Sequence, residues 1–162
     1  MNRLATVGLV ALGQLALVGV AVAPQISARV AGDTYQLRVQ PLDPIDPFRG
    51  AYVTLGYPDL QRGDSQGFDG GLGDMTDDEA GDVFITLREE GDVWVADSWE
   101  RERPDDGPYL ACDDRDWQIR CGIESWFLPQ DEAAAMERNL VNGAIATVKI
   151  DSRGHAAVVD VE

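Results

Sequence analysis

Two cysteines carry the most specific chemistry in this sequence. Cys112 and Cys121 are the only cysteines in the chain, and eight residues separate them. In an oxidising compartment such a pair forms a disulfide, which would stabilise the fold by about 2–3 kcal/mol through loop entropy. Two free thiols, or a metal or redox site, are the alternatives. Zinc needs further soft ligands and His155 is the only histidine, so we favour the disulfide and expect no metal or cofactor.

Glu124 is the acidic residue of greatest interest, because it lies in a segment with the composition of an apolar strand. A carboxylate buried there is either paired with an arginine, such as Arg49 or Arg120, or kept as a functional acid. We favour the structural ion pair. If Glu124 instead converged with Asp43 and Asp46 in one cleft, the chain would be a cell-envelope hydrolase that uses carboxylates.

Nucleophilic catalysis has little support in the sequence. Ser98 and Ser125 lie in strand-like segments with no G-x-S-x-G turn, Lys149 is the only lysine, and His155 lies in or just after a tight turn.

Residues 63–82 are rich in glycine and aspartate and poor in apolar side chains. Such a segment can wrap a hard cation such as calcium, but the spacing fits neither an EF-hand loop nor a nonapeptide repeat. We therefore expect a flexible, solvated loop, with weak cation binding as the alternative.

Four tryptophans lie on strand-like segments, and they allow two interpretations. They can fill a small β core, or they can form an exposed platform for a ligand. We favour core packing, and an aromatic-lined ligand-binding module is the alternative. The residues are Trp94, Trp99, Trp117 and Trp126.

The elements that must position these residues are mostly strands. Alternation of apolar and polar residues, interrupted by turn residues, predicts six to eight strands in one β-rich domain, a barrel or a sandwich, with one short soluble helix. The predicted strands and hairpins cover 35–39, 51–57, 83–87 with 93–96, 109–127, and 144–150 with 155–161, and the helix covers 131–140.

The N-terminal residues differ in kind from the rest. Leu4 to Ala23 contain no charge, and twenty helical residues span about 30 Å, the thickness of a bilayer core. A cleaved signal peptide is the alternative, since residues 21–23 form an A-x-A site, but Pro24 would follow the cut. We favour an uncleaved transmembrane anchor over 1–23, with Arg3 in the cytoplasm and a domain over 24–162 outside it.

The charge balance excludes one class of function. The chain has 13 basic and 29 acidic residues, a net charge of -16. Affinity for nucleic acid depends on Lys and Arg neutralising phosphates, so we expect no nucleic-acid partner.

Residues 41–57, Pro-Leu-Asp-Pro-Ile-Asp-Pro-Phe-Arg-Gly-Ala-Tyr-Val-Thr-Leu-Gly-Tyr, resemble the signature of the bacterial membrane-anchored family named for its GDYxxLxY motif. Gly50, Tyr52, Leu55 and Tyr57 match, whereas Ala51 stands where the motif has Asp. Residues 122–129, Gly-Ile-Glu-Ser-Trp-Phe-Leu-Pro, also look like that family.

The resemblance implies a membrane protein of unknown role, encoded near a polytopic membrane protein, and it brings no catalytic residues. The expected motif surface consists of Asp43, Asp46, Arg49, Gly50, Tyr52, Leu55 and Tyr57. We therefore expect a non-enzymatic accessory or interaction module, anchored in the bacterial inner membrane by one helix, with the bilayer and a polytopic membrane protein as partners.

Overall fold

The computed structural model describes residues 3–41, 52–61, 80–115, 119–127 and 143–162. The predicted helix over 131–140, Trp117 and nearly all of the Gly- and Asp-rich segment lie outside the described residues. The elements, in chain order, are α1 Arg3–Ala31, β1 Asp33–Pro41, β2 Tyr52–Gly56, the 3-10 turn η1 Pro58–Leu60, β3 Asp82–Glu90, β4 Val93–Glu100, β5 Tyr109–Asp113, β6 Ser125–Phe127, β7 Ala144–Ile150 and β8 Ala156–Val161.

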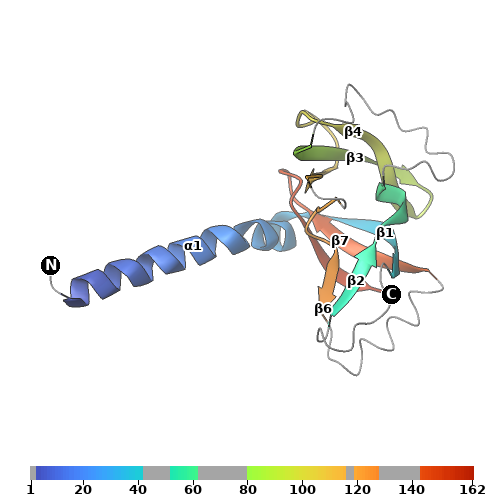
Figure 1. The fold of residues 1–162 in the computed structure, drawn as a ribbon. Coiled ribbons are helices and arrows are strands. Elements are labelled where there is room, and N and C mark those ends of the chain that lie inside the picture. Colours follow the sequence, from blue (N-terminus) through green and yellow to red (C-terminus); the bar gives the residue numbers. More distant parts are fainter. Residues whose placement is uncertain (1–2, 42–51, 62–79, 116–118, 128–142) are drawn as a thin grey trace.

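The strands form two antiparallel sheets that together make a partial barrel (Figure 1). One sheet has the order β6-β2-β1-β7-β8 and the other β4-β3-β5. Alternate residues of each strand point into a common core, which Leu37 and Val148 enter from the first sheet and Ile85 and Leu110 from the second. The predicted β-rich fold is confirmed.

Two predicted hairpins are confirmed, and one of them has a tighter turn than expected. β7 pairs with β8, and β3 pairs with β4. The predicted four-residue connection between β3 and β4 is wrong, because only Gly91 and Asp92 separate the strands. Gly91 has φ +68°, the left-handed conformation that a two-residue hairpin turn requires.

The predicted hairpin over 109–127 is only half correct. Arg120 pairs with Asp113 at the end of β5, but β6 pairs with β2 in the other sheet. The chain changes direction at Gly122, whose φ of +81° is accessible to glycine and strained for other residues. This bend carries the polypeptide from one sheet to the other.

Cys112 and Cys121 form a disulfide, as expected, and the strand pairing explains why they meet. Asp113 and Arg120 exchange two backbone hydrogen bonds of 2.8 Å, so they are a hydrogen-bonded pair. The next pair along an antiparallel ladder is the closer, non-hydrogen-bonded kind. The cysteines occupy that pair, with their Cα atoms 4.1 Å apart.

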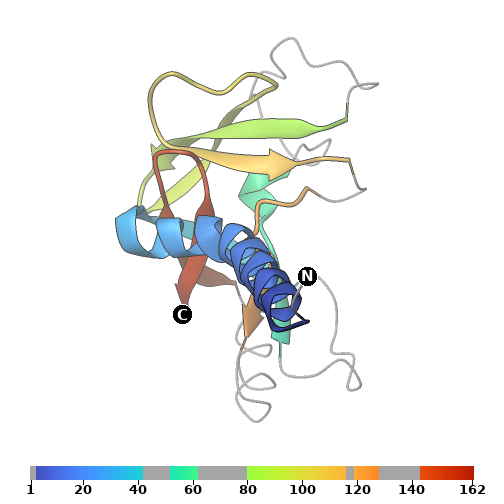
Figure 2. The same ribbon diagram turned by 90° about the vertical axis from the view of Figure 1, so that its left-hand side faces the viewer.

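Helix α1 is longer than the sequence predicts. It continues through Pro24 to Ala31, so the expected boundary at residue 23 falls inside a continuous helix. Within α1, the 26-residue stretch Thr6–Ala31 is long and apolar enough to cross a membrane. The side chains over 6–23 are exposed on all sides. Figures 1 and 2 show this helix projecting from the β domain, with only its last turns against β7 and β8.

The turn between β7 and β8 packs against β5 of the other sheet. The N–H of Ala111 donates to the carbonyl of Gly154 at 2.9 Å, which joins the two sheets. Gly154 has φ +81°, and a Cβ there would lie 2.6 Å from the Tyr109 ring and 2.8 Å from the Ala111 nitrogen. Only glycine permits so close an approach of the turn to the strand.

We predict that Gly154→Ala destabilises the fold by about 2–4 kcal/mol, the sum of left-handed strain and overpacking. The matched control is Gly91→Ala, which has φ +68° but nothing within 4 Å of the added Cβ. Its expected cost is the strain alone, about 1 kcal/mol. Urea unfolding of the full chain in detergent measures both, and equal losses of stability would contradict the role given to the close contact between this turn and β5.

Candidate functional site

The two segments that resemble the GDYxxLxY pattern lie side by side in the structure. β2 pairs antiparallel with β6, with Val53 opposite Trp126 and Thr54 opposite Ser125. The contact continues beyond the strands, because the N–H of Leu55 donates to the carbonyl of Glu124 at 2.8 Å. These segments, about seventy residues apart in sequence, therefore form one structural unit.

Tyr57 links the two segments from within the core. The residue is 7% exposed, and its hydroxyl donates to the carbonyl of Ile123 at 2.8 Å. Burial, reinforced by the negative charge of Glu124, raises the pKa of Tyr57 above its usual value. The phenol therefore stays protonated and keeps its hydrogen bond, as a buried polar group requires.

The expectation that the motif forms an exposed surface is wrong for two of its residues. Leu55 is 1% exposed and Tyr57 is also buried, because both share the inward face of the chain with Val53. They stabilise the core and cannot contact a partner. Tyr52 lies in β2, opposite Phe127. The other predicted members of the motif surface, Asp43, Asp46, Arg49 and Gly50, lie outside the described residues.

Glu124 lies on a bend immediately before β6, not within a strand as predicted. Its carboxylate accepts hydrogen bonds from the backbone N–H groups of Cys121 and Gly122, the latter at 3.1 Å. It therefore stabilises the bend that follows the disulfide. The predicted partner Arg49 lies outside the described residues.

The three described tryptophans contribute to the core. Trp99 is 2% exposed, and Trp94 and Trp126 are partly buried against the same cluster. Trp94 also makes an edge-on contact with Tyr35, with ring centroids 5.0 Å apart. This arrangement favours core packing over an exposed aromatic platform.

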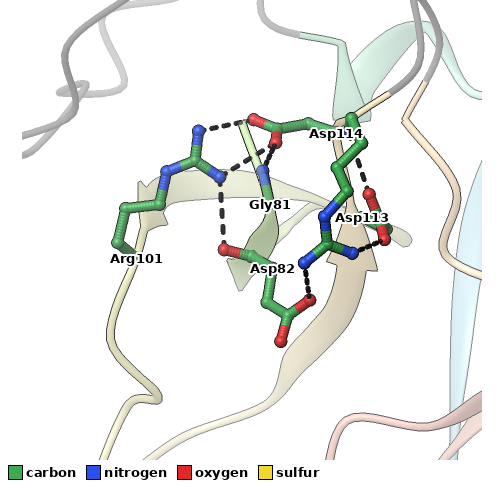
Figure 3. A network of polar contacts seen from close by, with 6 residues as sticks. Gly81, Asp82, Arg101, Asp113 and Asp114 are labelled. Atoms are coloured by element: carbon green, nitrogen blue, oxygen red, sulfur yellow. Dashed lines mark hydrogen bonds and ion pairs between the residues drawn. The ribbon is translucent and has the colours of Figure 1, made fainter. Parts of the chain in front are cut away.

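A network of charged residues holds the start of β3 to the end of β5, as Figure 3 shows. Arg101 and Asp114 make a two-pronged ion pair with distances of 2.9 and 2.8 Å. The N–H of Gly81 donates to the same carboxylate at 2.7 Å, and Arg115 pairs with Asp113 and Asp82. These carboxylates are engaged in positioning the backbone, and nothing in the sequence beyond its many charges predicts this network.

The junction between α1 and the β domain is built around Asp151, whose side chain is 3% exposed. The Ser27 hydroxyl donates to this carboxylate at 2.5 Å, and the backbone N–H groups of Arg153 and His155 donate at 2.8 and 3.0 Å. Burial alone would raise the pKa of Asp151, but the hydrogen bonds outweigh it and the pKa is lowered. The charged carboxylate thus ties the helix to the β7–β8 turn.

Ser27, Asp151 and His155 are residue types found together in hydrolases, but their order here is different. Nδ1 of His155 lies 3.1 Å from Oδ2 of Asp151, the same oxygen that accepts from Ser27. In a catalytic triad the histidine stands between serine and aspartate and accepts the serine proton. Here the aspartate stands between the other two, so the cluster positions the helix and does not activate the serine.

We predict that Tyr57→Phe destabilises the fold by about 1–3 kcal/mol, because the buried Ile123 carbonyl loses its donor. In the wild type, stability falls above pH of about 10, since the unfolded tyrosine then ionises and the folded one does not. Tyr57→Phe has no phenol to ionise at this position, so its stability should fall less at alkaline pH than that of the wild type. Urea unfolding at pH of about 8 and about 10.5 measures both effects.

The control is Tyr35→Phe, on a ring that is only partly buried. The expected loss of folding stability in this variant near pH 8 is about 0.5 kcal/mol or less. Equal losses at the two positions would contradict the role assigned to Tyr57.

Comparison with protein-family models supports the resemblance that the motif suggested. The family model for the GDYXXLXY protein matches residues 14–161, which include the second half of α1 and the whole β domain. Comparison with curated proteins and with solved structures found no match. Since the match covers most of the sequence, the chain belongs to the GDYXXLXY protein family.

Proposed function

We propose that this chain is a single-pass protein of the bacterial inner membrane, and that its β domain lies outside the cytoplasm as a non-enzymatic accessory module for a polytopic membrane protein. The observation that carries the proposal is α1. Its side chains over 6–23 are apolar on every side apart from Thr6 and Gln14, and all are exposed. A soluble helix normally has one polar face, whereas a membrane helix is apolar all round.

The continuity of α1 supports an anchor over a cleaved signal. Cleavage after Ala23 would cut within a helix that runs unbroken to Ala31 and docks on the β domain. The Cys112–Cys121 disulfide supports a location outside the cytoplasm, because disulfides persist in oxidising compartments. Arg3 at the start of the helix supports a cytoplasmic N-terminus.

A helical partner in the membrane is supported by Gln14. This amide lies near the middle of the apolar stretch, beside Gly13, where a second helix can approach closely. A side-chain amide in hydrocarbon gains by hydrogen bonding across a helix pair. The carboxylates of Asp151 and Glu124 are held by structural hydrogen bonds, which favours an interaction role over catalysis.

We predict that the tagged full-length chain, purified in mild detergent from carbonate-washed membranes, brings with it one polytopic membrane protein in near-stoichiometric amount. Gln14→Leu should lower the recovery of that protein about fivefold or more, since a hydrogen bond across helices is lost. Mass spectrometry of the eluate measures the ratio.

The matched control is Leu12→Ala, about 160° around the helix from Gln14, which should leave the ratio unchanged. Release of the chain by the carbonate wash would overturn the anchor. Retention in the membrane without a polytopic protein in the eluate would overturn the accessory role alone.

A further inference from the structure

We infer that the face of the β domain around the exit of α1 rests in the lipid headgroup layer, where basic side chains contact the phosphodiester groups of anionic phospholipids. This inference depends on the proposal that α1 is a membrane anchor. It adds an interaction surface on the β domain itself, which we call the headgroup face: residues 119–122, the turn 151–155, Arg29 and Lys149.

The contacts between α1 and the β domain indicate how far this face lies from the bilayer core. Nε2 of Gln25 donates to the carbonyl of Gly122 at 3.0 Å. Gln25 lies two residues beyond Ala23, the end of the uncharged stretch, which is a rise of about 3 Å. The headgroup layer is about 5–7 Å thick on each side of the bilayer core. The loop that carries Gly122 therefore touches the helix within that layer.

The next contacts up the helix extend the same face. Ser27 bonds to Asp151 at the β7–β8 turn, about 6 Å beyond Ala23. Nζ of Lys149 donates to the carbonyl of Arg29 at 3.2 Å, about 9 Å beyond Ala23, which is just above the headgroup layer and within reach of long basic side chains. Figure 2, which looks toward the domain from the side of the helix, shows the β7–β8 turn beside the end of α1.

The charges on this face differ from those on the rest of the domain. Arg29, Arg120 and Arg153 are exposed and Lys149 is half-buried, in a chain of 13 basic and 29 acidic residues. Long basic side chains reach from such a position to lipid phosphates while their stems stay on the protein. Four cations around one helix exit are therefore complementary to an anionic bilayer surface.

Two of the acidic residues close to this face are held by hydrogen bonds, and three others line a groove beside it. The Asp151 carboxylate is buried, and that of Glu124 binds backbone N–H groups. Exposed Asp33 begins β1, ten residues beyond Ala23. Asp33, Asp105 and Asp106 line a groove of about 840 Å³ that also includes Asp151 and Ser152 of the turn, and Arg103 lines the same groove.

Lys149, the only lysine, makes the inference testable at one site. The full-length protein is reconstituted into nanodiscs of phosphatidylcholine alone or with phosphatidylglycerol, and labelled with a neutral amine-reactive ester. A surface potential of about −30 mV gathers protons and lowers the reactive, neutral fraction of a nearby amine about threefold. We expect labelling of Lys149, measured by peptide mass spectrometry, to slow by about that factor in the anionic discs, and this effect to vanish in about 1 M salt.

Arg153→Glu should abolish most of the lipid dependence, because it removes a cation from the headgroup face. Arg88→Glu makes the same change of charge on the three-stranded sheet, where Arg88 pairs with Glu90 and Asp97, and it should leave the dependence intact. Equal labelling rates in the two kinds of disc, with the protein eluting with the discs, would overturn the headgroup face alone. Failure of the protein to elute with the discs would overturn the anchor as well.

Discussion

The arrangement of this protein depends on one buried carboxylate. Asp151 joins Ser27 of the helix to the β7–β8 turn, and the same turn contacts the second sheet through Gly154 and Ala111. The helix and both sheets therefore meet at the turn 151–155. A buried charge is tolerated only when hydrogen bonds satisfy it, and Asp151 accepts them from one side chain and two backbone N–H groups. The helix is thus attached to the domain by a specific contact and not by a linker.

The described residues of the family motif have a structural role inside the domain. Leu55 and Tyr57 are buried, and Tyr57 bonds to Ile123 in the second family segment. These residues hold β2 against β6 and fix the bend at Gly122. That bend is also where Gln25 of the helix contacts the domain. The described part of the motif therefore maintains the surface that faces the helix.

The sequence predicted the elements with strong local signals and failed where the signal was weak. Alternation located β1, β3, β7 and β8, and spacing located the disulfide. The true end of α1 was missed because polar residues and Pro24 follow the apolar stretch, and docking on the domain, not composition, carries the helix to Ala31. The partner of β6 was missed because a three-residue strand has too little alternation to identify it. The junction at Asp151 was missed, since the contact of this residue with Ser27 crosses 124 positions.

Hydrogen exchange across the junction tests the central claim most directly. A continuous helix docked through Asp151 predicts that amides 25–32 of the full chain in detergent are protected to a degree similar to those of β1, because the two segments open together. Replacing Asp151 with Asn should lower protection over 25–32 and leave the core of β3 unchanged. Exchange of residues 25–32 at the rate of a free chain, with β1 still protected, would show that a hinge separates the helix from the domain and would contradict the account.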